Sequence, residues 1–206
     1  MSEIVRAGYD AIAEQYLAWS LESDWPARRL YLGYLLDALA PRSDVLELGC
    51  GAGLPATRML VDAGHRVTAV DLSATQLDLA KRHVPEAWFI QADMVDVELP
   101  LETFDAVCGF YSLKHVPRDR HAELLAKVAR WLRPGGLFTA SFGRTDNPGE
   151  IEEDWLGAPM FMSHFDADTS RRMVEEVGFA LIRAELVTQI EHGHEGAFLW
   201  VLARRP

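Results

Sequence analysis

The nine residues VLELGCGAG at positions 45–53 constrain the fold more than any other stretch of this chain. A short apolar strand over 44–48 runs straight into three alternating glycines, and a helix is expected from about 54 to 63. Glycine permits a positive φ and lets a ligand approach the backbone without a Cβ in the way. A glycine-rich turn between strand and helix makes a nucleotide-sized cleft at the carboxyl end of a sheet. The stretch therefore predicts an α/β fold with a ligand site at this turn.

The glycine spacing indicates which nucleotide the turn would hold. A dinucleotide fingerprint is G-x-G-x-x-G, and the position of its third glycine is occupied here by Leu54. Glu47, just before the turn, would repel a pyrophosphate but would suit a ligand that bears an ammonium or a sulfonium. The pattern E-x-G-x-G-x-G resembles the first motif of the class I S-adenosylmethionine-dependent methyltransferases. A turn that binds no ligand remains the structural alternative.

The rest of the chain carries further elements of that family's pattern. The turn L-R-P-G-G at 132–136 precedes an apolar strand and is the second most specific local match. The resemblance implies a Rossmann-like three-layer α/β sandwich in a single domain, 1–206. Its sheet would be seven-stranded and mostly parallel, with an antiparallel C-terminal hairpin and helices on both faces. Strands are expected at 44–48, 66–70, 87–91, 104–110, 137–142, 180–190 and 197–203, and helices at 3–20, 27–39, 54–63, 73–82, 118–132 and 169–177.

Acids at the ends of two predicted strands are candidate cofactor ligands. Asp71 follows the second strand, where a carboxylate takes both hydroxyls of a ribose, whether the cofactor carries nicotinamide or methionine. The resemblance places Asp93 against the adenine amine and Met94 on the adenine ring. Ser73 and Gln76 fit a capping box and need no ligand role. The predicted cofactor-binding set, for S-adenosylmethionine or its product S-adenosylhomocysteine, is Tyr16, Glu47, Gly49, Gly51, Gly53, Asp71, Leu72, Asp93, Met94 and Phe110.

Two segments are expected to cover the cofactor. Residues 1–40 form an N-terminal helical lid, in which Tyr9 and Tyr16 resemble paired tyrosines over the methionine end of the cofactor; a plain core role is the alternative. Residues 144–165 read as a long irregular insertion after the fifth strand, and such insertions can line a pocket. An extra helix packed on the sheet edge is the alternative for this insertion. The predicted acceptor-binding set is Tyr111, His115, Trp155, Met160, Phe161 and His164.

His115 is the candidate general base, because a histidine with an ordinary pKa titrates near neutrality. Methyl transfer from a sulfonium can also proceed by proximity and desolvation alone, so a base is not obligatory. A capping or packing role for His115 is the alternative. His192 and His194, flanked by two glutamates, read as an exposed hairpin turn, and no metal site is predicted.

The composition of the chain limits the classes of molecule that it is expected to bind. The chain has 206 residues and a net charge of −11, and an acidic surface disfavours nucleic acid and anionic membrane. No apolar run reaches membrane-spanning length, and the two cysteines read as reduced thiols in a cytoplasmic protein. We expect a monomer or homodimer that methylates a small-molecule acceptor, with oxygen acceptors favoured over nitrogen or carbon by family frequency. The rival interpretations are an NAD(P)-dependent oxidoreductase and a non-catalytic S-adenosylmethionine-binding protein.

Overall fold

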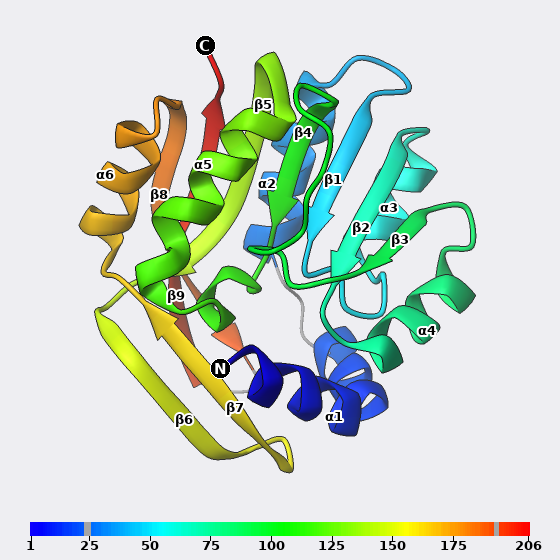
Figure 1. Cartoon of the computed structure of the whole chain (residues 1–206), viewed down its shortest axis with the longest axis vertical. Coiled ribbons are helices and arrows are strands. Elements are labelled where there is room, and N and C mark those ends of the chain that lie inside the picture. Colours follow the sequence, from blue (N-terminus) through cyan, green and yellow to red (C-terminus); the bar gives the residue numbers. More distant parts are fainter. Residues whose placement is uncertain (23–25, 192–193) are drawn as a thin grey trace.

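A seven-stranded sheet forms the centre of the protein, with the strand order β3-β2-β1-β4-β5-β9-β8 (Figure 1). The structure is a computed structural model that describes residues 1–22, 26–191 and 194–206. The first five strands pair in parallel, and β9 runs antiparallel to both β5 and β8, as predicted for this fold. The strands of this sheet are β1 Asp44–Leu48, β2 Arg66–Asp71, β3 Trp88–Gln91, β4 Phe104–Gly109, β5 Leu132–Gly143, β8 Ala180–Glu191 and β9 His194–Arg204.

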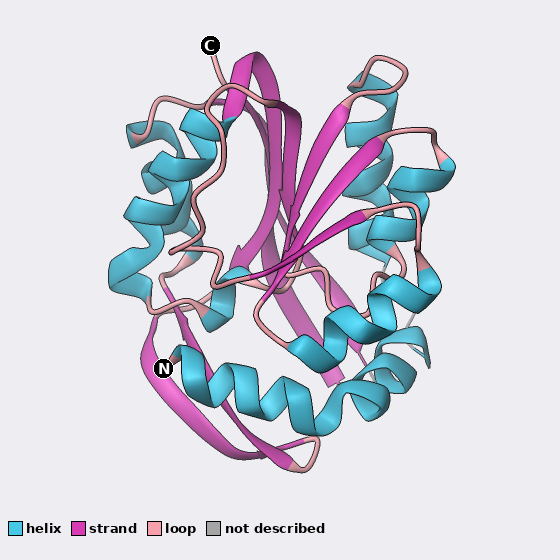
Figure 2. Ribbon diagram, turned by 45° about the vertical axis from the view of Figure 1, so that its right-hand side comes forward, coloured by secondary structure: helices cyan, strands magenta, loops and turns pink. Residues whose placement is uncertain are grey.

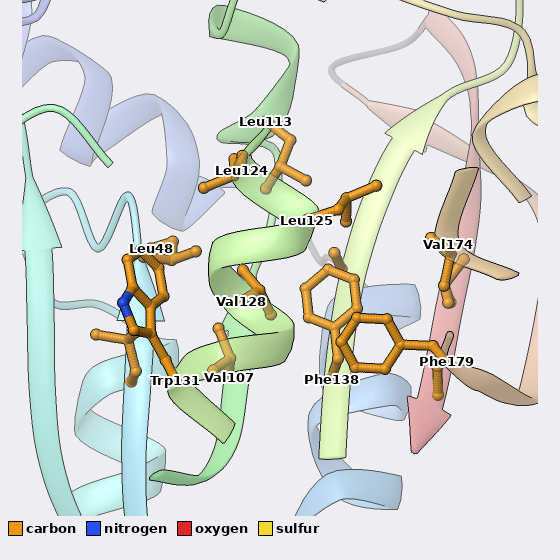
Figure 3. Close-up of a cluster of buried hydrophobic side chains, with 14 of the residues drawn as sticks. Leu48, Val107, Leu113, Leu124, Leu125, Val128, Trp131, Phe138, Val174 and Phe179 are labelled. Atoms are coloured by element: carbon orange, nitrogen blue, oxygen red, sulfur yellow. The ribbon is translucent and has the colours of Figure 1, made fainter. Parts of the chain in front are cut away.

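Helices cover both faces of the sheet, which gives the predicted three layers. Apolar residues of α2, α3 and α4 pack on one face, and those of α5 and α6 pack on the other. Figure 3 shows Leu124, Leu125 and Val128 of α5 against the sheet, a spacing that places all three on one side of a helix. The helices are α1 Ser2–Glu22, α2 Pro26–Ala38, α3 Ala56–Asp62, α4 Ala74–His83, α5 His121–Trp131 and α6 Ala167–Glu176, with short 3₁₀ turns η1 Leu113–His115 and η2 Arg118–Arg120.

The order of the strands fixes where a ligand site lies. The chain builds β1, β2 and β3 outward in one direction and then returns to place β4 and β5 on the other side of β1. A crevice forms at the carboxyl ends of the strands where this direction reverses. Leu48 pairs with Val70, so the glycine turn after β1 and Asp71 at the end of β2 meet at the same edge.

A two-stranded hairpin occupies the stretch that was expected to be irregular. β6 Asn147–Trp155 and β7 Ala158–His164 form a second, separate sheet. In Figure 2, α1 crosses the carboxyl ends of the main strands, and the hairpin lies along the outer side of α1. The hairpin is difficult to predict from the sequence, because β6 is almost fully exposed and rich in glutamate, which is uncommon in strands. Burial of Met160 and Phe161 of β7 against α1 outweighs that preference.

Several boundaries differ from the predictions. The fifth strand begins at Leu132 rather than 137, because Leu132 already pairs with Phe104 before the register shifts. The helix expected from 54 begins at Ala56. The predicted turn at 191–196 is shorter, since β8 and β9 reach Glu191 and His194, and His192 lies outside the described residues. Among the described residues, no helix is long and apolar enough to cross a membrane.

The contact between α1 and β7 can be tested at Gly8. A Cβ on Gly8 would lie 2.7 Å from the carbonyl oxygen of Pro159 and 2.9 Å from Cε of Met160. Gly8→Ala should therefore lower the free energy of unfolding by about 1–3 kcal/mol, which is the usual cost of overpacking. Urea titration of both proteins measures this difference.

Gly33→Ala in α2 is the matched control, because nothing lies within 4 Å of the added Cβ. Alanine is favoured over glycine inside a helix by about 0.8–1 kcal/mol, so this variant should be stabilised. Stabilisation of both variants would contradict the close packing of the hairpin on α1.

Candidate active site

A cavity lies between the carboxyl ends of β1, β2, β3 and β4 and the inner side of α1. Residues far apart in the sequence therefore meet around a single space at the predicted edge of the sheet. All but one of the predicted cofactor-binding residues line it, namely Tyr16, Glu47, Gly49, Gly51, Asp71, Leu72, Asp93, Met94 and Phe110. Gly53 does not line the cavity, because it turns toward α4, where an added Cβ would lie 3.4 Å from Cα of Ala80.

Asp71 holds the glycine turn in place. Its Oδ2 accepts the backbone N–H of Gly51 at 2.8 Å, and its Oδ1 accepts that of Ser73 at 2.9 Å. Burial raises the pKa of Asp71, while these backbone hydrogen bonds act in the opposite direction. Each carboxylate oxygen has a second lone pair, so the group can still accept two hydroxyl hydrogens in the cavity. The carboxylate therefore retains the acceptor capacity that the predicted contact with a ribose requires.

Helix α4 begins beside Asp71 with only half of the predicted capping box. The Ser73 Oγ accepts the N–H of Gln76 at 3.1 Å and donates to Asp10 Oδ1 of α1 at 2.6 Å. The Gln76 side chain does not accept the backbone N–H of Ser73, which is the second bond of a capping box. Its side-chain oxygen and nitrogen are both buried and have no hydrogen-bond partner among the described residues. Since Gln76 lines the cavity, its amide is available to a polar ligand there.

The adenine end of the predicted site is tied to the first turn of α1. Asp93 accepts the hydroxyl of Ser2 through Oδ2 at 2.6 Å, and it accepts the N–H of Val95 through Oδ1 at 2.9 Å. Ser2 and Met94 both line the cavity next to this carboxylate. The N-terminus of the chain thus lies against the predicted adenine site, a contact across 91 residues that no local pattern indicates.

Glu47 and Arg28 are both buried at the other end of the cavity. Glu47 is 4% exposed, and its Oε2 accepts the Thr57 hydroxyl at 2.6 Å. Burial raises the pKa of Glu47 to about 7, although the Thr57 bond and the charge of Arg28 lower it. The Arg28 guanidinium lies 5.9 Å from the centre of the Tyr111 ring, and burial lowers its pKa. This end of the cavity combines an acid with a cation, a set that suits an amino acid.

Tyr111 and Ser112 follow β4 and form the floor of the cavity. The Tyr111 hydroxyl accepts Nε2–H of Gln189 at 2.6 Å, which turns the ring toward β8. The Ser112 Oγ donates to the carbonyl of Leu48 at 2.7 Å. Ser112 packs so closely on the glycine turn that a Cβ added to Gly49 would lie 2.3 Å from the Cβ of Ser112. Gly49 also has a φ of 75°, so glycine is required there on both grounds.

The hairpin residues of the predicted acceptor set lie behind the lid and not in the cavity wall. The Trp155 ring centre is 5.6 Å from that of Tyr9 and 5.5 Å from that of Tyr16, so Trp155 supports these two rings from outside. The side chains of Met160 and Phe161 are buried against α1. His164 donates to the carbonyl of Thr145 at 2.7 Å, outside the cavity wall. These four residues line no part of the cavity, because the hairpin of β6 and β7 packs on the outer side of α1.

His115 lines the cavity as predicted, but its imidazole differs from the expected titrating base. Both ring nitrogens have protein partners, the Tyr9 hydroxyl at 2.9 Å and the carbonyl of Phe161 at 2.8 Å. Burial, with a smaller contribution from Lys114, lowers the pKa of His115 to about 3. The expectation of an ordinary pKa near neutrality is therefore wrong, because the loop is covered by α1 and β7.

The polar lining residues outside the predicted sets include Gln76, Arg28 and Ser2. Gln76 was explained by the capping pattern, although its unreturned bond is visible only in the structure. Arg28 stands between Ala27 and Arg29 in a helix whose other buried side chains are mostly apolar, and no sequence pattern distinguishes it from Arg29. Ser2 has no sequence signal at all, since its role depends on how α1 crosses the sheet.

Comparison with known proteins agrees with this geometry. Residues 45–136 match a family model described as a methyltransferase domain. An uncharacterized methyltransferase of Synechocystis is 30% identical over 173 residues, which cover 82% of this chain and 78% of the relative. A ubiquinone biosynthesis O-methyltransferase of Paracidovorax citrulli is 37% identical over 139 residues, or 61% of this chain and 57% of the relative.

A solved structure gives the same fold. The 1,6-didemethyltoxoflavin-N1-methyltransferase of Burkholderia thailandensis, crystallised with S-adenosylhomocysteine, superposes with a TM-score of 0.68 at 24% identity. The match covers 97% of this chain and 90% of that protein. At this identity the likeness concerns the fold alone.

The raised pKa of Glu47 predicts a pH-dependent stability. The folded state binds this proton more tightly than the unfolded chain, whose glutamate has the ordinary pKa of 4.5. The contribution of Glu47 to stability is therefore complete below that value and is lost as pH rises to about 7. Relative to the parent protein, Glu47→Gln should gain on the order of 3 kcal/mol between pH 4 and pH 8. Urea unfolding without ligand at both pH values measures this gain.

Glu175→Gln on the exposed surface of α6 is the control for this comparison. Its stability relative to the parent protein should not change over the same pH range. If the difference in unfolding free energy between Glu47→Gln and the parent protein is also the same at pH 4 and pH 8, Glu47 is not a buried group with a raised pKa.

Proposed function

Because this chain belongs to the class I S-adenosylmethionine-dependent methyltransferase family, we propose that it transfers a methyl group from S-adenosylmethionine to a small organic acceptor. An oxygen nucleophile is favoured over nitrogen or carbon. The observation that carries the proposal is the cavity between the strand ends and α1, which combines Asp71, Asp93, Gln76 and Glu47 in one lining. A cavity that is roofed by a helix and its supporting hairpin suits an acceptor of small size.

The residues around the cavity fit each part of the cofactor. Asp71 and the unpartnered amide of Gln76 would bind the ribose hydroxyls, and Asp93 with Met94 would bind adenine. At the other end, Glu47 would face the α-ammonium of methionine and Arg28 its carboxylate. The bound cofactor supplies a methyl group that is already activated by a sulfonium. The protein's own task is to orient the acceptor and to exclude water, which proximity and desolvation make effective.

The charge of the lining favours this cofactor over a dinucleotide. Three acids, Glu47, Asp71 and Asp93, line the described cavity, against the single guanidinium of Arg28. S-adenosylmethionine carries a sulfonium and an ammonium against one carboxylate, and the acids complement that excess of positive charge. A pyrophosphate in the same cavity would meet these three acids, with only the Arg28 guanidinium to compensate among the described lining residues. This argues against an NAD(P)-dependent oxidoreductase.

Ligand-induced stabilisation tests the choice of cofactor. A ligand that binds only the folded state stabilises it by about 2.7 kcal/mol when its concentration is a hundred times its Kd, and the melting temperature rises accordingly. S-adenosylmethionine and S-adenosylhomocysteine should both raise it, and NAD should not. Asp71→Ala should weaken S-adenosylhomocysteine binding by roughly ten- to a hundredfold in calorimetry, because charge-assisted hydrogen bonds are lost.

Asp78→Ala, on the exposed side of α4, is the matched control and should bind like the parent protein. Stabilisation by NAD alone would make the oxidoreductase the better hypothesis. Parent affinity in Asp71→Ala would remove Asp71 from the ligand site.

The hairpin is proposed to shape the acceptor site through the lid rather than by direct contact. Trp155 supports the rings of Tyr9 and Tyr16, which do line the cavity. Aromatic pairs contribute about 0.5–1.5 kcal/mol each, so Trp155→Ala should weaken S-adenosylhomocysteine binding by roughly three- to tenfold. The control is Ile151→Ala on the exposed strand of the same hairpin, which should leave the affinity unchanged. Equal affinities in all three proteins would mean that the hairpin does not support the lid.

A further inference from the structure

The hydrogen bonds of His115 fix which ring nitrogen carries its hydrogen. Nδ1 lies 2.8 Å from the carbonyl oxygen of Phe161, and a carbonyl can only accept. Nδ1 must therefore carry the hydrogen, which leaves Nε2 as an acceptor. The Tyr9 hydroxyl lies 2.9 Å from Nε2 and must donate its hydrogen to that nitrogen. One chain of two bonds thus joins the lid helix, the turn η1 and the hairpin strand β7.

Burial keeps this chain in one protonation state. His115 is 8% exposed, and its lowered pKa leaves the ring neutral through the physiological pH range. Burial also raises the pKa of Tyr9 well above its ordinary value, with additional contributions from Tyr16 and Asp71. Neither group changes its charge near pH 7, so the direction of the hydrogen bond is constant.

Tyr9 lies close to the predicted ribose site. The Tyr9 ring centre lies 5.1 Å from that of Tyr16, and Tyr16 faces the Gly51 turn that Asp71 holds. All four residues line the cavity. In S-adenosylmethionine the sulfur is bonded to a carbon of the ribose. Tyr9 reaches from this end of the cavity to His115 in the turn after β4, so we place its hydroxyl beside the sulfonium and the methyl group that it activates.

We infer that His115 is a positioning residue that holds the hydroxyl hydrogen of Tyr9, so that Tyr9 presents only its oxygen lone pairs to the sulfonium end of the cofactor. The inference rests on the proposed function, because it requires S-adenosylmethionine in the cavity. A lone pair favours the positively charged sulfonium over the neutral thioether of the product. Without His115 the Tyr9 hydroxyl loses the acceptor that fixes its hydrogen, and it can turn that hydrogen toward the positive charge. His115 then acts through Tyr9 and not as the base that the sequence predicts.

The experiment compares two affinities in the same protein. Calorimetry gives the Kd of S-adenosylmethionine and of S-adenosylhomocysteine, and their ratio reports the recognition of the sulfonium. Tyr9→Phe should shift this ratio against S-adenosylmethionine by about three- to tenfold, the size expected for one hydrogen-bond-like contact. His115→Ala should shift it in the same direction. His115→Gln should recover most of the loss, because an amide offers one N–H to Phe161 and one oxygen to Tyr9.

Tyr34→Phe on α2, outside the cavity lining, is the matched control and should leave the ratio unchanged. An unchanged ratio in Tyr9→Phe would overturn the inference, and so would a His115→Gln protein that is as impaired as His115→Ala. If the parent protein binds neither ligand, the proposed function itself fails, which is a distinct outcome.

Nitrogen NMR of the histidine rings in the parent protein provides a test that needs no variant. The inference predicts that His115 carries its hydrogen on Nδ1 and does not titrate between pH 5.5 and pH 8. A hydrogen on Nε2, or a titration within that range, would overturn it.

Discussion

The buried carboxylate of Asp71 is the interaction on which the site depends. It accepts backbone N–H groups from Gly51 and from Ser73, and so joins the glycine turn after β1 to the start of α4. Ser73 then donates to Asp10, which connects the same point to the lid helix. A single side chain at the end of β2 thus sets the positions of turn, helix and lid. Burial of such a group is costly unless its lone pairs are used, and here the backbone uses them.

Electrostatics and shape select the same ligand at this site. The cavity is lined by acids at its proposed ribose and adenine ends, whereas an acid and a guanidinium share its far end. Glu47 is raised in pKa by burial and still lies near the charge of Arg28. This arrangement complements a ligand that has an amino acid at one end, a positive charge in the middle and a nucleoside at the other.

Local patterns were sufficient for the parts of the site that lie next to a strand end. The strand 44–48, the glycines after it, Asp71 and Asp93 could be predicted because each follows a run of apolar residues whose direction fixes where the next residue lies. The contact between Tyr9 and His115 spans 106 residues and depends on how α1 crosses the sheet, which no periodicity encodes. The sequence does not predict the hairpin 147–164, because its residues have a weak intrinsic preference for strands. The hairpin forms because one side of β7 is buried against α1. Gln76 was given a local explanation that its geometry only half supports.

We propose that α1 closes over a cofactor bound at the ends of β1 and β2. Amide hydrogen exchange, with and without S-adenosylhomocysteine, tests it most directly, because exchange reports local opening along the whole backbone. We expect the ligand to slow exchange in residues 2–22 of α1 as well as in the turns at 49–53 and 71–76. Protection of the turns with no change in α1 would show that the helix does not close the site. Protection of neither would contradict the account as a whole.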